Sequence, residues 1–159
     1  MIKNHRERKL NRLKGYDYSS DGGYFITICT KNCEYLLSKI DKNSQVILSD
    51  FGKIAEKTLI ETANIYEHFI LDEFVIMPNH IHFIVFIKNN TQNTKSVSNF
   101  VRSFKSYTTK TINQTFKNNS FQWQKSFYDK IIRNEEAFLN IKNYIQNNPL
   151  NWQNDEYFL

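Results

Sequence analysis

The sequence predicts an α+β fold. Short runs rich in β-branched and aromatic residues alternate with longer runs in which apolar residues recur every three or four positions. Their order is strand–helix–strand–strand–helix–strand, followed by a last helix. The chain has 159 residues, of which 40% are hydrophobic and 15% aromatic, enough for one packed core. We therefore expect one domain.

Composition also indicates a cytoplasmic location. No uninterrupted apolar run approaches the roughly 18 residues that a membrane span requires. The charges at the N-terminus are not followed by an apolar segment, which argues against an export signal. Cys29 and Cys33 match no zinc or redox spacing, and Cys29 lies in an apolar run typical of a buried free thiol.

The first strand and helix follow a basic N-terminal arm. Residues 1–22 are polar and basic and lead into a turn signal at Asp21-Gly22-Gly23, so we expect the arm at 1–22 and the domain at 23–159. Residues 24–30 alternate and are rich in β-forming residues, which predicts a strand. After a polar stretch with an apolar patch at 46–48, Ser49 precedes a helical segment that reaches about Tyr66.

A hairpin and a second helix occupy the middle of the chain. Residues 69–76 and 80–87 are predicted strands joined at Met77-Pro78-Asn79. Residues 97–112 then form an amphipathic helix. Its apolar stripe contains Val97, Phe100, Val101, Phe104, Tyr107 and Ile112.

The last strand and helix complete the fold. Residues 127–132 predict a fourth strand, and Asn134 caps a helix with Glu135 and Glu136 in its first turn, where acidic groups complement the helix dipole. Because Pro149 disfavours helix before it, this helix ends near 147–149. Two strand–helix–strand units joined by a hairpin predict the ferredoxin-like split β-α-β arrangement, an antiparallel sheet with helices on one face.

Two of the four histidines lie at the start of the third strand. Strand side chains alternate between faces, so His80 and His82 point the same way, roughly 7 Å apart along the backbone. Pro78 marks the strand entrance, where side chains are usually accessible. Two imidazoles can hold two positions of a metal shell and leave others open. Taken alone, the pattern favours the ordinary alternative of two hydrogen-bonded histidines at a sheet end.

Tyr144 and Asn148 lie four residues apart, on one side of the last helix. By default, a tyrosine on an apolar stripe packs in the core, but the histidine pair raises the alternative of a displayed phenol. A phenol titrates near 10, so it needs activation or a polarised electrophile to attack a phosphodiester. Two imidazoles with the amide oxygen of Asn148 suit a hard divalent ion, Mg²⁺ or Mn²⁺, better than a closed zinc site.

The net charge of +5 is unevenly distributed. Residues 1–14 hold six basic side chains against Glu7, and residues 95–133 hold eight against Asp129. Two separate basic blocks indicate a polyanionic partner, and we expect this partner to be nucleic acid, which suits a cytoplasmic, nucleoid-associated protein. The alternative is a solvated surface with a loose basic tail.

These features together resemble a known family. The matching segments include Met77-Pro78-Asn79-His80-Ile81-His82 and the stretches 12–18, 23–30, 74–82, 104–106, 128–135 and 144–149. The chain is similar here to the REP-associated tyrosine transposases, relatives of the single-tyrosine insertion-sequence transposases in the HUH endonuclease superfamily. In that resemblance His80 and His82 fall on the metal-binding pair, Tyr144 on the nucleophile and Asn148 on the third ligand. Phe83 replaces the family's glycine, and we expect it to narrow the mouth of the site.

The resemblance implies cleavage of single-stranded DNA near a hairpin, with Mg²⁺ or Mn²⁺ as cofactor. Tyr144 would form a 5′-phosphotyrosyl intermediate and release a 3′-OH, which can later reverse the step. Unpaired bases would stack on Trp123 or Tyr128 unless these are core residues. The basic side chains expected to hold the DNA backbone are Arg6, Arg8, Lys9, Arg12, Arg102, Lys105 and Arg133.

Other functions remain open at this point. A domesticated family member would bind hairpins without cutting them. A non-catalytic module that binds RNA on a ferredoxin-like sheet lacks its usual glycine–aromatic signature here. A replication initiator or relaxase would place its tyrosine elsewhere, and a zinc hydrolase lacks a third His or Cys at a useful spacing. The sequence leaves the choice between monomer and homodimer open.

Overall fold

The main sheet has the predicted topology. The computed structural model describes residues 13–91, 95–117 and 119–158. Four antiparallel strands lie in the order β4-β5-β1-β6. Their bounds are Phe69–Ile76 for β4, His80–Ile87 for β5, Gly22–Cys29 for β1 and Tyr128–Ile132 for β6. One helix connects β1 to β4 and a second connects β5 to β6, so the ferredoxin-like split unit is confirmed.

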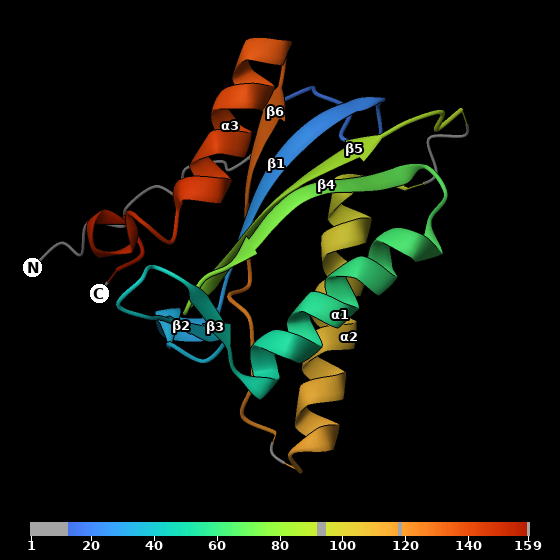
Figure 1. Ribbon diagram of the computed structural model, residues 1–159. Helices are drawn as coiled ribbons and strands as arrows, with labels where there is room; N and C mark the ends of the chain where they lie inside the picture. Colours follow the sequence, from blue (N-terminus) through green and yellow to red (C-terminus); the bar gives the residue numbers. More distant parts are fainter. Residues whose placement is uncertain (1–12, 92–94, 118, 159) are drawn as a thin grey trace, which may run out of the picture.

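Helices cover both faces of this sheet (Figure 1). The helices α1 (Asp50–Ile65) and α2 (Val97–Thr115) pack on one face, and α3 (Glu135–Asn147) crosses the other. The predicted caps are present: Ser49 Oγ accepts from Gly52 N at 3.0 Å, and Asn134 Oδ1 accepts from Ala137 N at 2.8 Å. One face of the sheet therefore carries α1 and α2, and the other face carries α3.

Strand alternation assigns side chains to the two faces. Tyr24, Ile26 and Ile28 of β1 are fully buried toward α1 and α2, whereas Phe25 belongs to the smaller cluster beneath α3. Phe83 follows the same rule. It is fully buried in the core behind the sheet, with its ring centroid 5.8 Å from that of Phe100. The expectation that Phe83 narrows the mouth of the site is therefore wrong, because its side chain points to the face opposite the histidines.

Several boundaries differ from the predicted ones. The apolar patch at 46–48 is strand β3 (Val46–Leu48), paired with β2 (Ser38–Ile40) in a separate hairpin that we did not predict. Helix α2 continues to Thr115, beyond the predicted end at residue 112. The sequence did not indicate this extension, because residues 113–115 are all polar. Strand β6 begins at Tyr128, one residue later than expected.

The N-terminal arm can be followed from residue 13. Tyr16 and Tyr18 pack on Tyr24 with ring centroids 6.3 and 6.0 Å away, so this part of the predicted arm lies against the domain. None of the helices within residues 13–91, 95–117 and 119–158 has the length and apolar character needed to cross a membrane.

Candidate functional site

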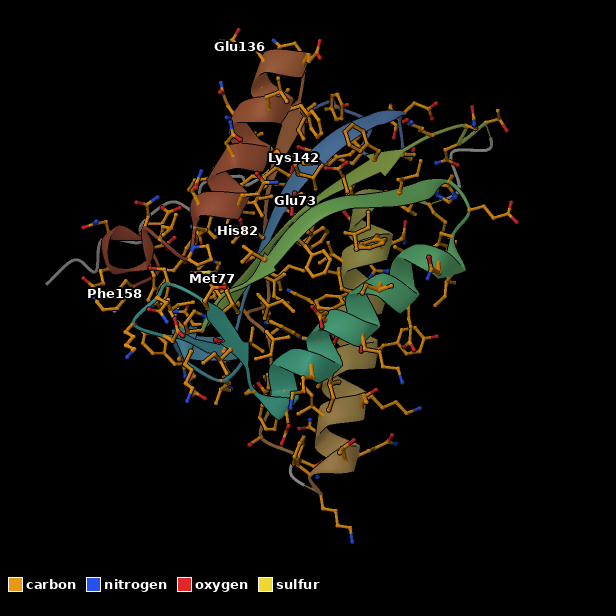
Figure 2. All side chains as sticks on the ribbon, in the orientation of Figure 1. Glu73, Met77, His82, Glu136, Lys142 and Phe158 are labelled. Atoms are coloured by element: carbon orange, nitrogen blue, oxygen red, sulfur yellow. The ribbon has the colours of Figure 1, made fainter. Side chains whose placement is uncertain are left out.

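The two histidines meet on the α3 face of the sheet. Their Nε2 atoms are 3.0 Å apart. Figure 2 shows His82 next to the C-terminal end of α3. Both side chains are enclosed: His80 is 0% exposed and His82 is 1% exposed. The expectation of an accessible pair at the strand entrance is wrong, because residues from α3 and the segment that follows it cover both rings.

Hydrogen bonds fix the orientation of the His80 ring. The amide nitrogen of Asn79 donates to the carbonyls of Cys33 at 3.2 Å and Tyr157 at 2.7 Å. The Oδ1 atom of Asn79 must therefore accept the 2.8 Å hydrogen bond from Nδ1–H of His80. The neutral ring then carries its lone pair on Nε2, directed at His82.

The ring of His82 has a matching arrangement. Its Nδ1 lies 2.8 Å from Oγ1 of Thr27, its neighbour on β1. When Thr27 accepts this bond, Nε2 of His82 also presents a lone pair. Metal-binding histidines are usually held this way, with the second ring nitrogen donating to an oxygen.

Asp155 lies beside the histidines and forms with them a group that could hold a metal ion. One oxygen of its carboxylate and one nitrogen of each imidazole all lie within 4.8 Å of one another. We expected Asn148 in this role. Asn148 lies at the end of α3, 2% exposed, and its amide nitrogen donates to Asp155 Oδ2 at 2.7 Å. No spacing along the chain links Asp155 to the histidines, so sequence reasoning missed Asp155.

These donors fit a hard divalent cation. Two neighbouring ligands of an octahedral ion with bonds of about 2.1 Å are about 3 Å apart, which matches the two Nε2 atoms 3.0 Å apart. Among the residues that the structure describes, the Oδ1 atom of Asn148 is buried without a hydrogen-bond partner, as expected for an oxygen that awaits a ligand. Burial lowers the pKa of His80 to about 3 and that of His82 well below its usual value, so both imidazoles are neutral at pH 7.

Tyr144 points from α3 into this cluster. Its hydroxyl lies 3.3 Å from His82 Nε2, and its side chain is 42% exposed. The ring is held edge-on to Phe25, with centroids 6.1 Å apart at 88°. Burial, and then the carboxylates of Asp155 and Glu156, raise the pKa of Tyr144 to about 12. The phenol therefore keeps its proton at neutral pH.

The segment after α3 closes the side of the site near His80. The ring of Tyr157 lies 4.5 Å from that of His80 and 6.0 Å from that of His82, measured between centroids. Trp152 lies 6.0 Å from His80. Sequence reasoning missed this segment, because it has no regular periodicity beyond the short turn Trp152–Asn154.

The structure describes three of the predicted DNA-binding residues, Arg102, Lys105 and Arg133. Arg6, Arg8, Lys9 and Arg12 lie outside the described residues. Arg102 and Arg133 are exposed, but Arg102 is on α2, which packs on the face opposite the histidines. Lys105 donates to three carbonyls, those of Gln124, Lys125 and Ser126, at 2.6, 3.3 and 3.0 Å. An ammonium has three N–H groups, so Lys105 is engaged in holding this loop.

The two aromatic residues predicted to stack on unpaired bases, Trp123 and Tyr128, have different surroundings. Trp123 is 8% exposed and packs between Phe104 and Phe121, so it is a core residue. Tyr128 is 52% exposed on β6, where it pairs with Thr27 and so shares the face of His82.

Comparison with known proteins identifies the family. Residues 24–148 match the sequence model of the IS200-like transposases. The chain belongs to this family. An uncharacterised protein of Haemophilus influenzae is 35% identical to it over an alignment 175 positions long, which covers 98% of this chain and 94% of the relative.

Two solved structures share the fold of this transposase-family chain. A REP-associated tyrosine transposase bound to a REP hairpin aligns with a TM-score of 0.63 and 20% identity, over 89% of this chain and 73% of that one. A transposase-like protein from Deinococcus radiodurans aligns with a TM-score of 0.54 and 16% identity, over 86% and 97% of the two chains.

Proposed function

We propose that this protein cleaves and rejoins single-stranded DNA next to hairpins, with Tyr144 as nucleophile and Mg²⁺ or Mn²⁺ as cofactor. One observation carries the proposal: the Tyr144 hydroxyl lies 3.3 Å from His82 Nε2, within the cluster of His80, His82 and Asp155. Membership of the IS200-like transposases supports it. The hairpin bound to the REP-associated transposase supports hairpin DNA as the substrate class.

The reaction exchanges one phosphodiester for another. The Tyr144 oxygen bonds to phosphorus as the bond to the 3′ oxygen breaks, which leaves a 5′-phosphotyrosine. The proton of the Tyr144 hydroxyl passes through solvent to the departing 3′ oxygen, which becomes a free 3′-OH. Attack by a 3′-OH reverses the step, so no nucleotide cofactor is consumed.

The chain's own residues position the reactants. Asn79 and Thr27 hold the two imidazoles, and Phe25 fixes the Tyr144 ring edge-on. A divalent ion held by His80, His82 and Asp155, with Asn148 as a further ligand, would polarise the scissile phosphate. In the metal-free protein burial raises the pKa of Tyr144 to about 12, so the hydroxyl carries its proton before the reaction and loses it during the attack that we propose.

Binding of DNA and cellular setting are part of the same proposal. The exposed Arg102 and Arg133 and the basic residues 1–14 contact the DNA backbone, and Tyr128 offers an exposed ring for a base. The histidines, Tyr144 and Asp155 belong to one chain, so a monomer is sufficient. Such an enzyme acts on chromosomal DNA in the cytoplasm.

The decisive experiment is detection of the covalent intermediate. Labelled single-stranded hairpin DNA is incubated with the protein and Mg²⁺ or Mn²⁺, and a protein–DNA adduct is sought on a denaturing gel. We expect an adduct for the wild type and for Tyr128→Phe, and none for Tyr144→Phe. Hairpin binding without any adduct would instead indicate a protein that binds hairpins but does not cut them. The enclosure of both histidines is the observation that favours this second candidate function. An adduct on a peptide lacking Tyr144 would contradict the assignment of the nucleophile.

A further inference from the structure

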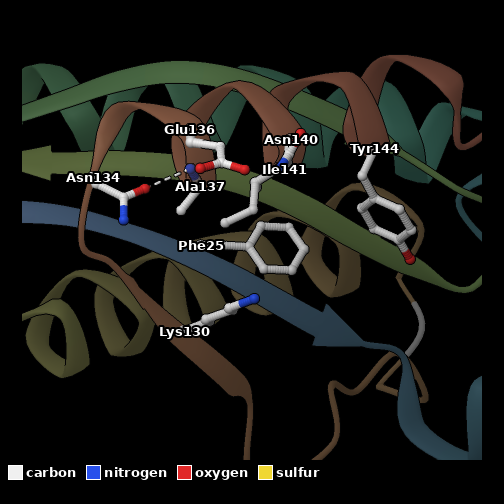
Figure 3. Close-up of a pocket in the computed structure, with 8 residues that line it drawn as sticks. All are labelled: Phe25, Lys130, Asn134, Glu136, Ala137, Asn140, Ile141 and Tyr144. Carbon is white, nitrogen blue, oxygen red and sulfur yellow. Dashed lines mark hydrogen bonds between the residues drawn. The ribbon is translucent and has the colours of Figure 1, made fainter.

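A pocket beside Tyr144 has no role in the reaction described so far. It lies between α3 and the strands β1 and β6 and has a volume of about 510 Å³ (Figure 3). This is within the range of small-molecule sites, about 300–1,000 Å³. The lining residues that matter here are Phe25, Lys130, Glu136, Asn140, Ile141 and Tyr144.

The pocket is continuous with the histidine site. Tyr144 lines it while its hydroxyl reaches His82 Nε2 at 3.3 Å. Phe25 forms the second link, because its ring centroid is 6.1 Å from that of Tyr144 and 5.2 Å from that of His82. A group in the pocket would therefore be a direct neighbour of a phosphate attacked by Tyr144.

The pocket wall combines an aromatic ring with unused polar groups. Lys130 is the cross-strand neighbour of Phe25, so both project from the same face of the sheet. Glu136 and Asn140 project from α3 on the other side. Within the described part of the chain, the side chains of Lys130, Glu136 and Asn140 make no hydrogen bond or ion pair. Three polar groups of different kinds are thus available to a ligand.

We propose that this pocket binds one unpaired nucleotide that adjoins the scissile phosphate. The inference rests on the proposed function. The base stacks on Phe25, which is the usual way in which proteins hold single-stranded nucleic acid. Lys130 contacts a backbone phosphate. The negative charge of Glu136 repels a phosphate from the α3 side of the pocket, so the edge of the base lies on that side.

The lining also predicts a base preference. A carboxylate accepts hydrogen bonds from exocyclic amino groups, and an amide such as Asn140 both donates and accepts. Adenine, cytosine and guanine carry an amino group, whereas thymine does not. We therefore expect an amino-bearing base to be favoured over thymine by about fivefold, the equivalent of one net hydrogen bond of about 1 kcal/mol.

A fluorescence scan tests occupancy of the pocket without requiring cleavage. In the Tyr144→Phe background, each unpaired nucleotide beside the hairpin is replaced in turn by 2-aminopurine, whose fluorescence falls on stacking. We expect one position to be quenched on binding, with the quenching lost in Phe25→Leu and reduced in Lys130→Ala. Asn140→Ala is compared with Asn143→Ala as its matched control, here and in the cleavage panel below, since Asn143 is an exposed asparagine on the same helix outside the pocket. Quenching that is absent at every position, or unchanged in Phe25→Leu, would overturn the proposal.

A cleavage panel tests the base preference. Wild-type protein is given four hairpin substrates that differ only in the base at the quenched position. We expect the fivefold preference against thymine to fall below twofold in Glu136→Gln and Asn140→Ala and to persist in Asn143→Ala. Equal cutting of all four substrates by the wild type would overturn base reading by the pocket but leave the nuclease proposal intact. Absence of a covalent adduct with all four would contradict the proposed function, while the fluorescence scan would still decide whether the pocket is occupied.

Discussion

At the scale of single residues, the histidine pair has two roles that substitution will separate. His80 and His82 are buried and hydrogen-bonded, so they contribute to stability in addition to the metal binding that we propose for them. We expect His80→Ala or His82→Ala to abolish DNA cleavage and Mn²⁺ binding. Each should also lower the free energy of unfolding by about 1–3 kcal/mol, because a buried partner loses its hydrogen bond.

Calorimetric titration with Mn²⁺ and thermal unfolding of the metal-free proteins measure the two effects. His68→Ala is the control, since His68 lies at the opposite end of the strand pair, next to Phe69. Wild-type Mn²⁺ affinity in the His80→Ala, His82→Ala double variant would rule out the metal role.

Asp155 provides a second prediction at this scale. Asp155 accepts from Asn148 Nδ2 on Oδ2 and from the Tyr157 backbone N–H on Oδ1, so Asp155→Asn keeps only one of these two acceptors and also removes the negative charge from the cluster. We expect at least a tenfold loss of Mn²⁺ affinity, and a lower melting temperature from the one lost hydrogen bond. Glu156→Gln is the matched control, because Glu156 is adjacent in the chain but is not part of the metal-binding group. Equal affinities for the two variants would leave Asn148 as the better candidate for third ligand.

At the scale of elements, Lys105 shows how a helix residue can serve a loop. Its ammonium is bonded to three carbonyls just before β6, and burial lowers its pKa to about 8. We expect Lys105→Met to lower the melting temperature while changing hairpin affinity no more than Lys110→Met does. Lys110 is exposed on the same helix and so controls for loss of charge alone. The measurements are thermal unfolding and hairpin titration at several salt concentrations; a much greater affinity loss in Lys105→Met at unchanged stability would restore the original DNA-binding assignment.

At the scale of the whole molecule, the two buried imidazoles make stability depend on pH. Unfolded histidines take up a proton near pH 6.5, but burial lowers the pKa of His80 to about 3 and that of His82 well below its usual value. The unfolded state then binds more protons at acidic pH, so stability is complete above about 6.5 and is lost as pH falls toward about 3.

We therefore expect the melting temperature measured in EDTA to decrease steadily between pH 7 and pH 4. The slope should be shallower in His82→Gln, which cannot take up the second proton. Identical slopes for His82→Gln and wild type would mean that His82 titrates normally in the folded protein.

Features that depend on a single helix or strand could be predicted from the sequence. Alternation in β5 placed His80 and His82 on one face, and helical spacing placed Tyr144 and Asn148 on one side of α3. The order of strands and helices determined the sheet topology, because the split β-α-β connection allows few other arrangements. Each of these follows from a local period that the chain cannot escape once the element forms.

Contacts between residues that are distant in the sequence could not be predicted in this way. Asp155 lies seven residues beyond Asn148 in a segment without periodicity, and its place beside the histidines depends on how that segment folds back after α3. Trp123 lies in the core and Phe25 lines the pocket beside Tyr144. Both are aromatic residues near or within strands, so residue type alone does not distinguish the two positions. Burial of the histidines, and with it their lowered pKa, arises from packing between α3, the segment after it and the sheet. Contacts of this kind depend on the path of the whole chain, and no spacing within one element encodes them.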